Sequence, residues 1–217
     1  MNLFIKNITV ISRYWILLFS LQIIFGADDS ESWNSIGFQV KLPYAFKIDF
    51  EQELRFQEQF SKYKQTFTEV SISYKILDGF RVFIPFRYTI GKDDKIKKRL
   101  SLGSSYKYNF KNIALKYRFK YQETYEQQEI PEELIRNKLS FYYDLTKKIE
   151  PYFSGEVFYP NNTSNYNYDE YRFSFGIVLD LPKKNELKVF FTYKVEDIHK
   201  SNPDHINVFG LAYNYQL

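Results

Sequence analysis

Apolar and polar side chains alternate along most of the chain. In FKIDFEQELRF, which spans Phe46–Phe56, large apolar side chains alternate with charged ones. Successive side chains of a β-strand point to opposite faces, so this stretch predicts a strand with one apolar and one charged face. The pattern returns in ten further runs. The predicted strands are Ser35–Leu42, Ala45–Phe60, Lys64–Leu77, Phe80–Ile90, Ile96–Tyr108, Asn112–Gln122, Asn137–Leu145, Ile149–Tyr159, Tyr168–Asp180, Glu186–Val195 and Ile206–Leu217.

Tight and wide connections alternate between these runs. LDG (Leu77–Gly79) and TKK (Thr146–Lys148) are tight, whereas GKDDK and PNNTSNYN are wide. Short periplasmic turns and longer external loops are typical of up-and-down barrels in an outer membrane. The pattern therefore predicts an all-β fold, a single up-and-down antiparallel transmembrane β-barrel of about 10–12 strands. Because such barrels have even strand numbers, we expect either a short extra strand near Ala27–Trp33 or closure by ten strands.

The volume of the side chains indicates which face points outward. The large apolar register contains many aromatic residues, while the opposite register is rich in serine, glycine, alanine and charged residues. A small closed barrel has little room for bulky inward side chains, so the apolar register is expected to face lipid. Gln52, Lys98 and Ser104 interrupt that register. A soluble periplasmic barrel or sandwich, with the same alternation, is the alternative.

Composition narrows the choice further. The chain has 217 residues, 20% aromatic residues and no cysteine, which excludes disulfides and thiolate metal sites. A mean hydropathy of −0.45 excludes a bundle of membrane helices. No linker-like segment divides the series of strands, so a single barrel domain is expected.

The first 26 residues have the pattern of a secretory signal. Lys6 and Arg13 precede the apolar run WILLFSLQIIFG, and the acidic stretch GADDSES follows. The apolar run is shorter than the roughly 20 residues of a membrane-spanning helix, although an uncleaved anchor is the alternative. The expected organisation is a signal peptide at 1–26 and an outer-membrane barrel domain at 27–217. Removal of the signal peptide lowers the formal charge of the chain from +4 to about +2. This nearly neutral charge argues against a nucleic-acid partner.

Several blocks resemble one family. They are the start at Trp33, KIDFEQELRF, IEPYFSGEVFY (Ile149–Tyr159), YRFSFGIVLDL (Tyr171–Leu181) and the final GLAYNYQL. Together they resemble the family catalogued as domain of unknown function 2490 (DUF2490), exported bacterial proteins expected to form outer-membrane barrels. The resemblance implies the barrel fold and the bacterial outer membrane as location, with membrane lipid and lipopolysaccharide as surroundings. It brings no activity and no catalytic residues.

The last strand carries a further resemblance. Tyr213, Tyr215 and Leu217 place apolar side chains at alternate positions up to the final residue. This is similar to the terminal signal recognised by the machinery that assembles outer-membrane barrels, which would make that machinery a partner. An ordinary final strand is the alternative.

The chain shows little sign of catalytic chemistry. His199 and His205 stand near Asp197 and Asp204 in the last long loop, where an outer-membrane hydrolase could place a site. No G-x-S-x-G or H-E-x-x-H motif is present. We therefore predict no catalytic, cofactor-binding or metal-binding residue and expect a protein that is not an enzyme. An outer-membrane enzyme acting on lipid or peptide at the extracellular rim is an alternative function.

The inward register carries more bases than acids. The predicted basic wall consists of Arg81, Arg87, Lys97, Arg99, Lys116, Arg118 and Lys120. The predicted acidic residues of the lumen are Asp49, Glu51, Glu53, Glu150 and Glu156. Because these acids fall on strands distant from the bases, the wall is expected to favour anions in a narrow channel. The alternatives are a structural barrel whose lumen is filled by ion pairs and a soluble periplasmic binding barrel.

Overall fold

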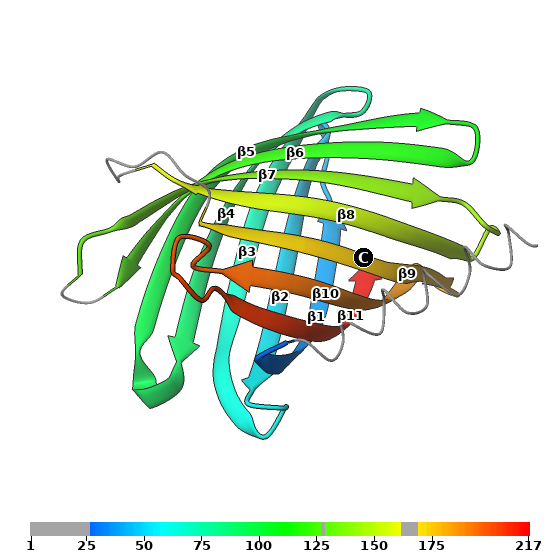
Figure 1. The fold of residues 1–217 in the computed structure, drawn as a ribbon. Helices are drawn as coiled ribbons and strands as arrows, with labels where there is room; N and C mark the ends of the chain where they lie inside the picture. The colour runs from blue at the N-terminus through cyan, green and yellow to red at the C-terminus, as the bar shows by residue number, and fades with distance from the viewer. Residues whose placement is uncertain (1–26, 127–128, 162–168) are drawn as a thin grey trace, which may run out of the picture.

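A computed structural model describes residues 27–126, 129–161 and 169–217. The signal peptide expected at 1–26 lies outside these residues. The described chain forms strands and one 3-10 turn, η1 at Lys92–Asp94 (Figure 1). The strands are β1 (Asp29–Lys41), β2 (Phe46–Gln57), β3 (Lys62–Leu77), β4 (Phe80–Gly91), β5 (Ile96–Phe110), β6 (Ile113–Glu126), β7 (Glu132–Tyr143), β8 (Ile149–Pro160), β9 (Glu170–Leu181), β10 (Asn185–Glu196) and β11 (Asp204–Gln216).

The strands close into a single barrel in chain order. Each strand from β1 to β11 pairs antiparallel with the next, as expected for an up-and-down barrel. The barrel closes through β1 and β11, which run parallel from the pair Asp29–Ile206 to the pair Gln39–Gln216. The predicted fold class, an all-β up-and-down barrel of 10–12 strands, is confirmed, with one parallel seam inside it.

The expected even number of strands is wrong. The described residues contain neither a separate strand near Ala27–Trp33 nor a ten-strand closure, because that region belongs to β1 itself. Asp28 donates its backbone N–H to the carbonyl of His205, 2.8 Å away, so the chain joins the beginning of β11 directly. β1 and β11 both run toward the tight turns, and an odd count with a parallel closing pair is the consequence.

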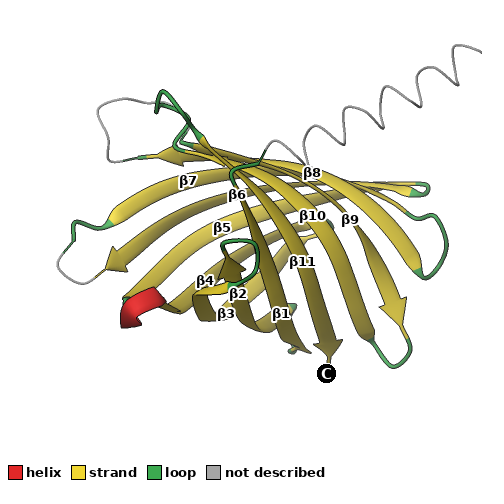
Figure 2. Cartoon of the chain, turned by 60° about the horizontal axis from the view of Figure 1, so that its bottom comes forward, coloured by secondary structure: helices red, strands yellow, loops and turns green. Residues whose placement is uncertain are grey.

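The connections gather at the two ends of the strands (Figure 2). The connections after β1, β3, β5, β7 and β9, the tight turns of two to five residues, lie at one end. The wide connections, of four to nine residues, lie at the other end, and those after β2 and β4 are no longer than the turn after β1. The turn after β3 has Gly79 at φ 81°, the left-handed conformation that a tight hairpin requires. Within the described residues, no helix is long and apolar enough to cross a membrane.

The apolar register faces outward on every strand. Only Trp33, Ile206 and Val208 form a buried apolar cluster among the described residues, with Phe190 packed against it. The exposed apolar side chains include Ile36, Phe50, Ile72, Ile84, Leu102, Leu115, Phe141, Phe153, Phe175, Val189 and Leu211. A continuous apolar band of this kind is typical of the lipid-facing surface of a membrane barrel and not of a soluble protein.

Exposed tyrosines lie toward both ends of the strands. Tyr74, Tyr106 and Tyr143 are near the tight turns, while Tyr63 and Tyr125 are near the wide connections. Transmembrane barrels carry such aromatic girdles where the apolar band meets the headgroups.

Gln52 interrupts the apolar face without exposing unpaired polar atoms. Its amide nitrogen donates to Thr66 Oγ1 at 2.7 Å, and its amide oxygen accepts from the Thr68 hydroxyl at 2.5 Å. All three side chains belong to the outward register of β2 and β3, so the polar groups satisfy one another within the apolar surface.

Candidate functional site in the barrel lumen

A polar cavity of about 510 Å³ occupies the barrel interior. All eleven strands contribute to its lining, mostly from the strand halves nearer the wide connections. Its basic side chains are Arg55, Lys64, Arg87, Lys97, Arg99, Arg118, Arg136, Lys138, Arg172, Lys188 and Lys194. Its acidic side chains are Glu51, Glu53, Glu132, Glu156, Glu170 and Glu196. Eleven bases and six acids line the cavity. Glu31, Glu69 and Glu126, outside the lining, pair with four of these bases, so a smaller excess of positive charge remains.

A change of register brings one of these bases inward. The pairing of β2 with β3 shifts between Arg55 and Phe56, so that Arg55 pairs with Gln65 and Phe56 with Tyr63. Lys64 is the extra residue of this β-bulge, and bulges redirect side chains in this way. The Lys64 ammonium reaches the cavity and lies 2.7 Å from Glu31 Oε1.

Arginines and aromatic rings alternate around part of the wall. The Arg55 guanidinium carbon lies 3.8 Å from the Trp33 ring centroid and 5.2 Å from that of Phe67. Arg87 continues the series at 3.6 Å from the Phe67 ring. Stacking on aromatic faces suits the planar guanidinium and restricts its motion.

The series continues in the other direction from Trp33. Arg172 lies 5.2 Å from the Trp33 ring and 4.5 Å from the Phe158 ring. The Arg136 guanidinium carbon also lies against Phe158, 4.3 Å from the ring centroid. We call the seven side chains Arg87, Phe67, Arg55, Trp33, Arg172, Phe158 and Arg136 the arginine–aromatic belt.

Each arginine of the belt has a carboxylate partner. Glu53 lies 2.5 Å from Arg55 and Glu69 lies 2.7 Å from Arg87. Glu170 pairs with Arg172 on the same strand. These partners come from the same or a neighbouring strand, so the belt is held by contacts along the wall.

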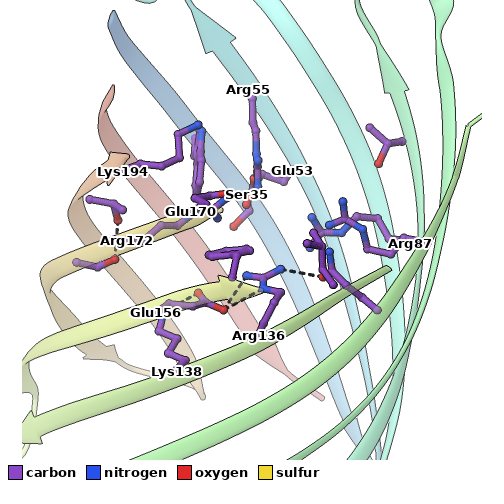
Figure 3. A pocket seen from close by; sticks show the side chains of 18 of the residues that line it. Ser35, Glu53, Arg55, Arg87, Arg136, Lys138, Glu156, Glu170, Arg172 and Lys194 are labelled. Carbon is purple, nitrogen blue, oxygen red and sulfur yellow. Dashed lines mark hydrogen bonds and ion pairs between the residues drawn. The ribbon is translucent and has the colours of Figure 1, made fainter. Parts of the chain in front are cut away.

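Glu156 is shared by three bases of the wall, of which Arg136 and Lys138 are labelled beside it in Figure 3. Its Oε1 lies 2.8 Å from Arg118 and 2.8 Å from Arg136, and its Oε2 lies 3.9 Å from Lys138. Arg136 also donates to Gln122 Oε1 at 3.2 Å. One carboxylate is therefore shared by three cations, which leaves a local excess of positive charge.

A second shared carboxylate lies at the seam. Glu31 is 1% exposed and accepts from Lys64, from Lys194 at 3.1 Å and from the Trp33 indole N–H at 2.7 Å. These bonds reach across β2 and across β11, so they join both sides of β1.

Ion pairs run along the wall and do not cross the lumen. All those found among the described lumen residues join side chains on the same strand or on strands at most two apart. The expectation that acids lie only on distant strands is wrong for Arg87 and Lys97, whose partners Glu69 and Glu126 lie on adjacent strands. Cross-strand register supplies these partners, which spacing in the sequence does not show.

On β4–β7, several basic residues pair directly with basic residues of the neighbouring strand. The directly paired residues include Arg87 with Arg99 and Lys120 with Arg136. The same holds for Lys107 with Lys116 and for Arg118 with Lys138. Like charges directly opposite each other on a sheet repel, so this region needs compensating anions. The described residues place no carboxylate within 4.0 Å of Arg99, Lys116 or Lys120.

The residues singled out from sequence divide into two groups. Arg87, Lys97, Arg99, Arg118, Glu51, Glu53 and Glu156 line the cavity. Arg81, Lys116, Lys120, Asp49 and Glu150 lie on inward positions of the wall outside that lining. Arg81 donates to Ser73 Oγ at 3.1 Å, and Asp49 lies 2.8 Å from Lys47.

Ten charged lining residues were not among those singled out from sequence. Five of them occupy inward positions within predicted strands, namely Arg55, Lys138, Arg172, Lys188 and Lys194. Glu170 stands at an inward position within the predicted strand Tyr168–Asp180, and Arg136 stands one residue before the predicted strand Asn137–Leu145. Glu196 likewise stands one residue past a predicted strand. Lys64 depends on the bulge, and Glu132 begins β7 within a stretch taken as loop.

Aromatic side chains narrow the lumen toward the tight turns. A Cβ at Gly210 would lie 1.9 Å from Phe190 Cζ, so the glycine leaves the space that this ring fills. Phe83 lies against Gly103 in the same way. Tyr142 and Tyr152 stack nearby with ring centroids 5.6 Å apart.

The two histidines do not form a recognisable catalytic pair. His199 is exposed in the connection after β10, while His205 belongs to β11 and bonds the Tyr193 hydroxyl through Nδ1 at 2.5 Å. Across the described ranges, no cluster of three potential metal ligands is found.

The comparisons with known proteins agree with the fold. A family model described as protein of unknown function (DUF2490) matches residues 30–205. No curated protein matches the chain in sequence.

Two solved structures share the architecture at low identity. The NanC porin is 10% identical, with a TM-score of 0.52 over 76% of this chain and 86% of the porin. A bacterial polysaccharide outer membrane secretin is 8% identical, with a TM-score of 0.53 over 79% of this chain and 64% of the secretin. The match thus spans less than two thirds of the secretin chain. At these identities the likeness concerns the fold, that of a transmembrane barrel.

Proposed function

We propose that this chain, which belongs to the DUF2490 family, forms a narrow channel in the bacterial outer membrane that favours small anions. The observation that carries the proposal is the lining of the cavity, where eleven basic side chains stand against six acidic ones. Rings of charged side chains select permeating ions by sign, and basic rings favour anions.

The arrangement of the charges supports a conducting lumen over a filled one. An ion-paired plug needs contacts between opposite walls, whereas the pairs described above follow the wall and leave a cavity of about 510 Å³. Arginines held against aromatic rings keep to the wall as well, which leaves space along the axis.

The outer surface supports the location. The apolar band and the tyrosines at its two edges suit a bilayer, and the closed barrel pairs each strand with a neighbour on both sides. The likeness to the NanC porin fold supports the same environment.

Planar-bilayer recording under a potassium chloride gradient tests the proposal. We expect conductance with a reversal potential displaced toward that of chloride. Lys97→Glu, which reverses a cavity charge, should shift the reversal potential toward that of potassium. Lys98→Glu is the matched control, because Lys98 is the next residue on β5 and its exposed side chain belongs to the outward register.

Two outcomes would contradict the proposal. A folded barrel that does not conduct would indicate a structural protein with a closed lumen. A reversal potential directed toward potassium in the unmodified protein would exclude the preference for anions.

A further inference from the structure

Three arginines, Arg87, Arg99 and Arg136, come together on the cavity wall at the inward face of β6. Arg99 of β5 donates its Nε–H to Thr124 Oγ1 at 2.9 Å. Arg136 of β7 donates to Gln122 Oε1 at 3.2 Å. Gln122 and Thr124 are successive inward positions of β6, so the two guanidinium groups approach the same part of the wall from opposite sides. Arg87 joins them from β4, because it pairs directly with Arg99.

The charges at this place are not balanced. Arg87 has Glu69 at 2.7 Å, and Arg136 has Glu156 at 2.8 Å. Glu156 is also the partner of Arg118 and lies 3.9 Å from Lys138. Arg99 therefore has only the neutral hydroxyl of Thr124 as a hydrogen-bond partner among the described side chains, although it faces another arginine.

Glu132 is the remaining carboxylate to consider. It pairs with Thr124 in the register of β6 and β7 and lines the cavity. Its side chain is exposed at the first position of β7, and it makes no ion pair with Arg99 within 4.0 Å. Glu132 attracts Arg99 electrostatically, but no ion pair between them occupies the guanidinium.

The neighbouring groups are already fixed in place. Arg87 stacks on the Phe67 ring at 3.6 Å and Arg136 on the Phe158 ring at 4.3 Å. Arg99 is anchored through Nε, so its two terminal nitrogens remain as a planar pair of donors that matches an oxyanion. Groups held in this way lose little freedom when a ligand binds.

We infer that Arg99, flanked by Arg87 and Arg136, forms a binding site for one oxyanion, the carboxylate or phosphate group of a small solute. The inference deepens the proposed function, since such a site would hold an anion on its way through the lumen. Binding does not require conduction, so the two ideas fail separately.

Isothermal titration of the full chain in a neutral detergent and low-chloride buffer tests the site. Inorganic phosphate and acetate are the two probes, and at least one should bind saturably at a single site. The tighter probe identifies the class of oxyanion. Arg99→Gln should weaken that binding by roughly tenfold or more, because it removes charge-assisted hydrogen bonds.

Arg81→Gln is the matched control. It removes the same charge from the lumen wall, at a position on β4 outside the cavity lining. It should weaken binding no more than about twofold, because salt largely screens charges that lie more than a Debye length from the site. Equal weakening by both substitutions would overturn the site in favour of a diffuse positive field, and so would the absence of saturable binding for both probes.

Arg99→Lys separates the site from the channel. It retains the charge but lacks the planar pair of donors, so it should weaken oxyanion binding while leaving the reversal potential of the channel unchanged. Arg99→Lys also tests the binding site if Arg99→Gln fails to fold. Binding unaffected by Arg99→Lys would overturn the paired-donor geometry. Saturable binding by a barrel that does not conduct would support the site and contradict the channel.

Discussion

Lys194 of β10 reaches Glu31 of β1 across the intervening strand β11, with 3.1 Å between Nζ and Oε1 and with side chains only 2% and 1% exposed. Because Glu31 also accepts from Lys64 and from the Trp33 indole, one carboxylate connects β1 with β3 and β10. The bond therefore supports the seam at which the barrel closes.

Glu31→Gln should destabilise the barrel by about 3 kcal/mol, because it leaves Lys64 without its carboxylate and Lys194 with Glu196 as its one remaining carboxylate partner. The measurement is the urea midpoint of unfolding in detergent. Glu58→Gln is the control, since Glu58 pairs with Lys62 at the exposed rim, and it should cost less than about 1 kcal/mol. Similar costs for the two substitutions would show that Glu31 does not support the seam.

Phe50→Arg should impair assembly by about 2–4 kcal/mol, as an arginine does on the lipid face near the bilayer midplane. Glu51→Gln, at the next position and facing the cavity, should cost much less. Heat-modifiable gel migration of the folded barrel reports both. Equal tolerance of the two changes would indicate a soluble barrel.

Gln52→Leu should cost about 1–3 kcal/mol, because it leaves the Thr68 hydroxyl without its partner. Replacing Gln52, Thr66 and Thr68 together by Leu, Val and Val should restore stability, since no polar atom then remains unpaired on the apolar face. Unfolding in urea measures both variants. A triple variant less stable than Gln52→Leu would contradict the explanation that Gln52, Thr66 and Thr68 satisfy one another on the apolar face.

Phe190→Ala should raise single-channel conductance, because the Phe190 ring helps to narrow the lumen near Gly210. Phe191→Ala is the control, as the Phe191 side chain belongs to the outward register and stacks with Phe175 and Phe209. A conductance that changes only with Phe191→Ala would place the constriction elsewhere.

The tight turns should face the periplasm. A cysteine at Ser201, in the connection after β10, should react with an impermeant thiol reagent in intact cells. A cysteine at Asp78, in the turn after β3, should react only after the outer membrane is opened. Labelling with the opposite pattern would reverse the orientation of the barrel.

Sequence alternation predicts the outward face well, because a strand has a strict period of two. Phe50 and Glu51 fall on opposite faces as expected, and the tight turn at Asp78–Gly79 has the expected left-handed glycine. These features depend only on neighbouring residues, so a single sequence is sufficient to predict them.

Features that depend on pairing between strands could not be predicted in the same way. Lys64 enters the lumen because of a register shift that neither strand shows on its own. Glu69 neutralises Arg87 because the two residues pair directly across β3 and β4. The contact of Trp33 with Arg172 of β9 requires the closed barrel, since β1 and β9 come together only through the closing pair of β1 and β11.

The parallel closure of β1 and β11 also bears on how the barrel forms and opens. Every other strand contact joins neighbours in the chain, whereas this one requires the two most distant strands to meet, which has the largest loop-closure entropy. Parallel ladders are slightly weaker than antiparallel ones. We therefore expect this contact to form last, and we expect amide protons of β1 and β11 to exchange with solvent before those of β5 and β6. In a bilayer, opening there would expose two unpaired strand edges to hydrocarbon. The cost of that exposure, more than the strength of the ladder, keeps the barrel closed.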